Sequence, residues 1–84
     1  MKDAEPIMET QIQINLFATL SKFRPAASDH YPITPGITIH NLLDELGIPQ
    51  EKAKLVFIDG VKRDLSSVLQ GGERVGIFPP VGGG

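Results

Sequence analysis

The end of the chain holds its clearest candidate for covalent chemistry. Residues 78–81 read Phe-Pro-Pro-Val and are followed by three glycines, Gly82, Gly83 and Gly84. Because glycine has no Cβ, such a tail can enter a narrow slot and bring the carboxylate of Gly84 close to another protein's active site. There the carboxylate can be activated. Glycine-rich chain ends are also commonly disordered, so the tail alone leaves both interpretations open.

The residues before the glycines give the tail a direction. Pro79 has no amide hydrogen and cannot extend a central ladder, so the chain must leave a sheet there. Pro79 and Pro80 together favour an extended, stiff conformation, which reduces the entropy lost when a partner binds the tail. Val81 is suited to anchor it in an apolar pocket. Phe78, at the exit, is either a core aromatic or part of a partner-docking surface.

The polar residues elsewhere do not suggest a second site. His30 and His40 are the only histidines, and no carboxylate pattern makes them metal ligands, so both are expected at the surface. Three further pairs fail on spacing or on a missing partner. They are Asp44 and Glu45, which diverge on a helix, Ser66 and Ser67, which lack a histidine base, and Gly71 and Gly72, which lack a phosphate-loop continuation. We therefore expect no metal or bound cofactor.

Length, charge and cysteine content narrow the class of protein. The chain has 84 residues, 8 basic and 10 acidic, with a formal charge of −2 and no cysteine. This length fits one domain with a stability of about 5 kcal/mol. Dispersed basic residues argue against nucleic-acid binding, and the lack of cysteine excludes disulfides and thiolate chemistry.

The beginning of the chain carries no targeting pattern. Residues 1–10 are polar and lack the apolar core of a signal peptide, and no apolar run is long enough to cross a membrane. We expect a cytoplasmic protein with a disordered segment at residues 1–10. Met8 offers a second possible start of translation.

The first third of the chain is expected to form two paired strands. Apolar residues at every second position predict a half-buried strand over residues 11–17. A small, polar stretch interrupted by Pro25 predicts a loop over residues 18–28. A second strand is expected over residues 29–34, antiparallel to the first.

The most regular pattern in the sequence is a helix. Its apolar residues recur at i, i+3, i+4 and i+7, which makes one stripe along a helix. They are Ile39, Leu42, Leu43 and Leu46. Thr38 is expected to cap its start, Gly47 to take the left-handed conformation at its end, and Pro49 to prevent it from resuming.

The second half of the chain alternates short strands with turns. We expect a helical turn over residues 49–54 and strands over residues 55–58, 61–63 and 74–78. Asp59-Gly60 favours a tight turn between the first two of these strands. Leu65, Val68 and Leu69 are expected to pin a loop or short helix to the core.

This order of elements predicts an α+β fold. One amphipathic helix is available to cover one mixed sheet of about five strands. A hairpin followed by a helix crossover and returning strands matches the β-grasp, or ubiquitin-like, arrangement, in which the first and last strands lie side by side at the sheet centre. The expected domain spans residues 11–78, and residues 79–84 form a flexible, extended tail.

The sequence resembles a known family at its end, its helix and one turn. Residues 71–84, the helix at residues 39–46 with the following Gly-Ile-Pro, and the Asp59-Gly60 turn are similar to the small, sulfur-carrying subunit of molybdopterin synthase. The resemblance covers residues 11–84 and indicates the ubiquitin-like sulfur carriers of the MoaD/ThiS type. The chain departs from it at Gly82, where that subunit often has another small residue.

The resemblance implies a carrier that is not an enzyme on its own. An ATP-dependent activating enzyme would adenylate Gly84, and sulfur would then replace AMP to give a thiocarboxylate. The tail would next enter the large synthase subunit and donate its sulfur to a pterin precursor of the molybdenum cofactor. The partners implied are these two proteins, with ATP used by the activating enzyme and no nucleic acid or membrane involved.

Three alternatives keep the same tail but change its use. Related carriers for thiamin thiazole synthesis also end in two glycines, and the Phe-Pro-Pro exit favours the pterin route. A ubiquitin-like modifier would join Gly84 to lysines of other proteins. A plain β-grasp interaction module would leave the tail inert.

Overall fold

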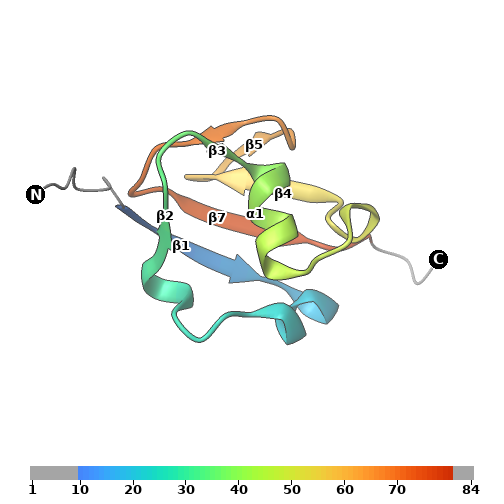
Figure 1. Cartoon of the computed structure of the whole chain (residues 1–84). Coiled ribbons are helices and arrows are strands. Elements are labelled where there is room, and N and C mark those ends of the chain that lie inside the picture. The colour runs from blue at the N-terminus through green and yellow to red at the C-terminus, as the bar shows by residue number, and fades with distance from the viewer. Residues whose placement is uncertain (1–9, 81–84) are drawn as a thin grey trace, which may run out of the picture.

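A five-stranded mixed sheet forms the frame of residues 10–80, the part of the chain that this computed structural model describes (Figure 1). The strand order is β2-β1-β7-β4-β5. The strands are β1 (Thr10–Leu16), β2 (Tyr31–Ile33), β4 (Leu55–Ile58), β5 (Val61–Arg63) and β7 (Arg74–Phe78). β1 and β7 are parallel, and the other neighbours are antiparallel. The predicted β-grasp order, with first and last strands side by side, is confirmed.

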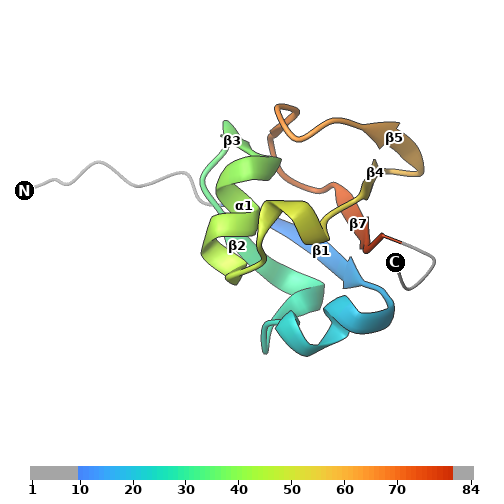
Figure 2. The ribbon, with the colours of Figure 1, turned by 90° about the vertical axis from the view of Figure 1, so that its right-hand side faces the viewer.

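Helix α1 (Ile39–Leu46) covers one face of this sheet and has the predicted bounds and caps (Figures 1 and 2). The Thr38 hydroxyl accepts a hydrogen bond from the Asn41 amide at 3.1 Å, and the Asn41 side chain accepts one from the Thr38 amide at 3.0 Å. This reciprocal capping box satisfies two donors at the helix start. Gly47 has a φ of 78° and ends the helix in the left-handed conformation.

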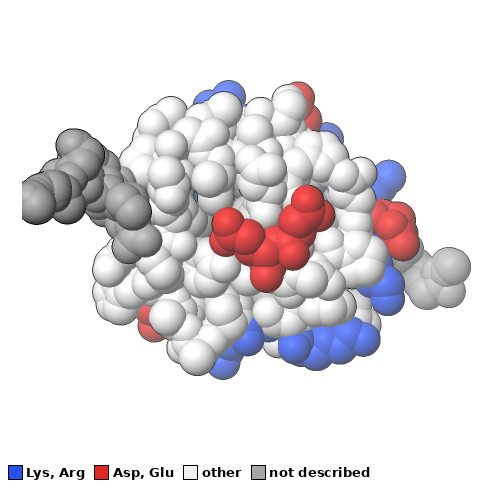
Figure 3. Space-filling model, in the orientation of Figure 1, with Lys and Arg blue, Asp and Glu red and all other residues white. Residues whose placement is uncertain are grey.

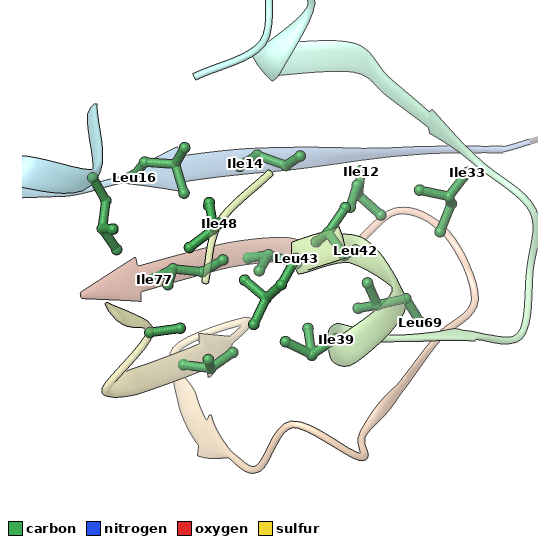
Figure 4. Close-up of a cluster of buried hydrophobic side chains, with 14 residues drawn as sticks. Ile12, Ile14, Leu16, Ile33, Ile39, Leu42, Leu43, Ile48, Leu69 and Ile77 are labelled. Atoms are coloured by element: carbon green, nitrogen blue, oxygen red, sulfur yellow. The ribbon is translucent and has the colours of Figure 1, made fainter. Parts of the chain in front are cut away.

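The hydrophobic core lies between α1 and the sheet (Figure 4). Leu42 and Leu43 of the helix pack over Ile12, Ile14 and the side chains of β7. All fourteen residues of this cluster are apolar, and within residues 10–80 no polar or charged side chain is buried. No helix in this range is long and apolar enough to cross a membrane.

The strand expected over residues 29–34 is shorter than predicted. Ser28–His30 form a 3-10 helix, in which the His30 amide donates to the Ala27 carbonyl at 3.0 Å, and β2 begins only at Tyr31. Serine and aspartate favour such local turns because their side chains compete for backbone hydrogen bonds. Conversely, Thr10, expected in the disordered segment, already belongs to β1, while residues 1–9 lie outside the described part of the chain.

The loop expected over residues 18–28 contains an ordered element. Residues Ala18–Phe23 form a 3-10 helix, and its Leu20 is only 1% exposed. This helix lets Leu20 reach the core, and Phe23 at its end is partly buried against the same core. The mostly small and polar composition of residues 18–28 gave no sign of this helix.

The loop expected near residues 65–69 is present only as far as Ser67. Leu65 packs against the core as predicted, whereas Val68 is 48% exposed. After Ser67, β6 (Val68–Leu69) pairs with β3 (Ile37–Thr38) as a separate two-stranded sheet. Leu69 is completely buried, as its apolar character suggested. Strands of two residues are too short to show an alternating pattern, so only tertiary pairing reveals them.

A tight turn at Gly71 and Gly72 leads into β7. Gly71 has a φ of 127° and Gly72 one of 84°, both unfavourable for residues with a Cβ. A Cβ on Gly71 would also lie 2.4 Å from the Thr10 side chain, whereas one on Gly72 would meet open space.

We predict that Gly71→Ala destabilises the fold more than Gly72→Ala. The backbone cost at Gly72 is about 1 kcal/mol, and the added collision with Thr10 should bring Gly71→Ala to about 2 kcal/mol or more. Urea unfolding of the two variants measures both values. Equal losses would contradict the close approach of Thr10.

Tyr31 links the edge strand β2 to helix α1. Its hydroxyl donates to the Glu45 carboxylate at 2.9 Å. Burial, followed by this hydrogen bond and the charge of Glu45, raises the pKa of the Tyr31 hydroxyl above its ordinary value. Because the folded state then holds the proton more tightly, this stabilisation is present below the ordinary pKa and is lost as the pH rises through the raised one.

We predict that Glu45→Gln lowers the pKa of Tyr31. The substitution removes the negative charge that opposes formation of the phenolate, although burial continues to raise the value. The chain has one tyrosine and no tryptophan, so ultraviolet absorbance reports this group alone. Asp44→Asn is the matched control and should leave the titration nearly unchanged.

Candidate functional site

The chain leaves the sheet where the sequence predicted. β7 ends at Phe78, whose carbonyl accepts a hydrogen bond from the Lys54 amide at 2.9 Å. Pro79 is half-buried and Pro80 exposed, and both border a hollow with Glu51, Lys54 and Leu55. This hydrogen bond fixes the backbone at Phe78, the last residue before the tail. The remaining predicted tail residues lie outside the described part of the chain. They are Val81, Gly82, Gly83 and Gly84.

Three phenylalanines gather beside this exit and form what we call the aromatic cluster: Phe17, Phe57 and Phe78. The rings of Phe17 and Phe78 are stacked, with centroids 4.2 Å apart and planes 3° apart. Phe57 meets Phe78 edge to face at 5.7 Å. Phe17 is 40% exposed, although a large aromatic side chain is usually covered. The cluster therefore presents apolar surface next to the root of the tail.

Strand register brings these rings together. Leu16 pairs with Ile77 in the parallel ladder, so the next residues, Phe17 and Phe78, adjoin. Phe57 pairs with Gly76, whose missing side chain leaves room for the neighbouring rings. Because side chains alternate between faces, all three rings lie on the sheet face opposite α1.

The backbone turns sharply at the residue after Phe17. Ala18 has a φ of 53°, a left-handed conformation that is uncommon for residues other than glycine. The Phe17 amide donates to the Ile77 carbonyl at 3.2 Å, so Phe17 stays tied to β7 while the chain turns away. This arrangement fixes the outer ring of the stack.

The sequence left Phe78 either in the core or on a docking surface, and the structure places it outside the core cluster. Its side chain is half-buried, yet it packs against Phe17 and Phe57 rather than within the core cluster beneath α1. Sequence reasoning missed the other two rings. A signal existed for Phe17, because the alternation that buries Leu16 places it on the face of Gln13 and Asn15.

The other polar candidates from the sequence lie at or near the surface. His30 is exposed, and His40 is half-buried with its ring against the Gln50 side chain. Asp44 and Glu45 are exposed on α1. No group of three or more histidine, aspartate or glutamate side chains within residues 10–80 is placed to hold a metal ion.

Ser66 and Ser67 belong to a turn that is organised by Asp64. The Asp64 carboxylate accepts from the Ser66 hydroxyl at 2.7 Å and from the Ser66 amide at 3.1 Å. These bonds, led by that of the hydroxyl, lower the pKa of the Asp64 carboxyl. Both serines therefore support a turn.

Charge is unevenly spread over the surface. Acidic side chains gather over the helix face, and basic ones lie at the margins of that view (Figure 3). The aromatic cluster lies on the opposite sheet face, near Arg74 and beyond the acidic patch. The hollow beside the cluster thus combines the three rings with one cation, Arg74.

The fold defines the class of protein, a small ubiquitin-like β-grasp domain, and the sequence defines the family. Residues 14–84 match the model of the ThiS family. The chain therefore belongs to the ThiS family and is a ubiquitin-like sulfur carrier of the ThiS/MoaD type. No curated protein matches it in sequence.

Solved structures share the fold at low identity. The HVO 2177 protein of Haloferax volcanii is 21% identical with a TM-score of 0.74, over 99% of this chain and 94% of that one. SAMP1 of the same organism is 21% identical with a TM-score of 0.62, over 88% and 99%. A Pyrococcus furiosus protein described as molybdopterin converting factor, subunit 1, is 22% identical with a TM-score of 0.58, over 86% and 99%.

We predict that Phe17 and Phe78 are energetically coupled. In a double-mutant cycle to alanine, the stacked pair should show a coupling of about 0.5–1.5 kcal/mol in the free energy of unfolding. Phe78→Ala combined with Val68→Ala, a site on the separate two-stranded sheet, should be additive. A coupling near zero for the first pair would contradict the stacked arrangement.

Proposed function

We propose that the chain carries sulfur as a thiocarboxylate on Gly84 and donates it in the synthesis of molybdopterin. The observation that carries the proposal is the exit of β7, where Pro79 and Pro80 leave the sheet directly beside the exposed aromatic cluster. The surface that we propose for docking thus adjoins the start of the tail. The match to the ThiS family extends to residue 84, which supports a role for the tail in sulfur transfer.

The chemistry of such a carrier starts from an unreactive carboxylate. An activating enzyme would let the Gly84 carboxylate oxygen attack the α-phosphorus of ATP, which forms the acyl adenylate and releases pyrophosphate. A sulfur nucleophile then attacks the acyl carbon, and AMP leaves with the bonding electron pair. With hydrosulfide as that nucleophile, loss of its proton leaves a thiocarboxylate whose sulfur is itself a nucleophile.

The residues of this chain would bind and aim the tail. Phe17, Phe57 and Phe78 supply apolar contact area with little conformational entropy to lose, because aromatic side chains have few rotatable bonds. The Lys54 amide holds the Phe78 carbonyl, so the tail starts from a fixed point. Val81 would then enter an apolar pocket of the partner, and Gly82 and Gly83 would pass through a narrow channel.

Two partners follow from this scheme, both proteins. One is the ATP-dependent activating enzyme, and the other is the large subunit of a molybdopterin synthase. The carrier itself would bind no cofactor and would act in the cytoplasm. The similar Pyrococcus furiosus protein is described as a subunit of a molybdopterin converting factor, and we extend that role to this chain.

The test is the intact mass of the full chain after incubation with the activating enzyme, ATP and a sulfur source. We predict an increase equal to replacing one oxygen atom by sulfur, which is lost when Gly84 is deleted. Phe78→Ala should slow the conversion about tenfold, because an aromatic anchor at an interface is commonly worth more than 1 kcal/mol. Val68→Ala is the matched control and should react normally.

The acceptor is tested separately with the sulfurated chain. Incubation with the large synthase subunit and the pterin precursor should return the mass to that of the carboxylate and yield the dithiolene product. Transfer only to thiazole synthesis, or attachment of Gly84 to lysines of other proteins, would contradict the pterin route. An unchanged mass in the first experiment would contradict the carrier chemistry itself.

A further inference from the structure

Strand β5 lies at one edge of the sheet, and in the described part of the chain its outer side is free. It pairs with β4 on one side only, and among residues 10–80 no strand covers its other side. All three of its residues, Val61, Lys62 and Arg63, are exposed. An exposed edge offers unpaired backbone groups to an added strand.

The register shows which residue offers those groups. Asp59 and Gly60 both have positive φ, 53° and 83°, as in the two-residue turns that close hairpins. The pair next to such a turn, Ile58 and Val61, is the hydrogen-bonded one, and pairs alternate along an antiparallel ladder. The N–H and C=O of Lys62 therefore point to the free edge.

Two hollows flank this strand and meet at Arg63, which lines both. The first has an apolar floor and a basic rim. It is lined by Ala53, Lys54, Val56, Lys62, Arg63 and Leu65, together with Asp64. The second contains Val61 and Val68, which are 52% and 48% exposed. Together they border the β5 edge with apolar surface and three cations.

The acidic residues of the hollows are already engaged as acceptors. Asp59 accepts from the Arg74 amide at 3.0 Å, and Asp64 accepts from Ser66. Glu73 accepts from the amides of Gln70 and Gly71 at 2.9 and 2.7 Å. These carboxylates keep their charge, but the first hollow holds only one of them, Asp64, beside the three cations of Lys54, Lys62 and Arg63.

We propose that the β5 edge binds an extended acidic peptide segment of a partner protein, which adds to the sheet as a sixth strand. Its backbone would pair with Lys62. Alternate side chains of the segment would be carboxylates, which meet Lys62 and Lys54, and apolar groups, which cover Val61 and Val68.

Charge and surface select this occupant over others. Lysine on an edge strand discourages pairing with another uncharged or basic edge, but it attracts a strand that carries carboxylates. A nucleic acid would satisfy the cations while leaving the exposed valines uncovered. The site lies at the opposite sheet edge from β2 and requires no glycine tail, so it extends the interactions of the protein beyond sulfur transfer.

The test uses the full chain labelled with nitrogen-15 and a capped peptide of alternating glutamate and valine. We expect amide shifts centred on Val61, Lys62 and Arg63, with smaller ones at Val68. Lys62→Glu should weaken binding about fivefold or more, since it removes one attraction and adds a repulsion. Lys62→Arg should retain binding, and Lys22→Glu, on the distant 3-10 helix, is the matched control.

Three probes decide the kind of binding. A peptide of alternating lysine and valine should not bind, and a glutamate-valine peptide methylated on its backbone nitrogens should bind at least fivefold more weakly because strand pairing is blocked. Equal binding of either peptide, or the same shifts with a short single-stranded oligonucleotide, would overturn the proposal. Deletion of Gly84 should leave peptide binding unchanged, which separates this test from that of sulfur transfer.

Discussion

The parallel pairing of β1 with β7 is the contact on which the rest of the structure depends. It joins the two ends of the domain at the sheet centre, where Ile14 and Ile77 are buried beneath α1. A parallel pair needs a long crossover, and here that crossover carries the helix that covers the pair. The same register aligns the end of β1 with the exit of β7. The core and the candidate docking surface therefore arise from one ladder, with opposite faces serving the two purposes.

Much of this frame could be predicted because its elements carry strong local patterns. The stripe of α1, the Thr38 cap and Gly47 define the helix without tertiary information, and the alternation around Ile12 and Ile14 defines β1. Prolines marked the exit because they cannot continue a ladder. What escaped prediction depends on contacts between distant residues. β3 and β6 have only two residues each, and the 3-10 helix at Leu20 is specified by a single buried side chain.

The candidate site was also only partly predictable from the sequence. Phe78 was identifiable from its position before two prolines, but its stack with Phe17 depends on the register of strands that are remote in sequence. The sequence did contain one sign of this stack, because Phe17 is an aromatic residue on the otherwise polar face of β1. The edge of β5 carried no such sign, because Lys62 and Arg63 look like ordinary surface charge until the strand order places them outermost.

The direction of the central pair also has a practical consequence. Because β1 and β7 run the same way, Thr10 lies at one end of the sheet and Phe78 at the other (Figure 1). A tag, dye or fusion partner joined before residue 10 is thereby separated from the outlet of the tail by roughly the length of a strand, about 15–20 Å. The parallel arrangement therefore makes residue 10 a point of attachment that lies away from the exit of β7.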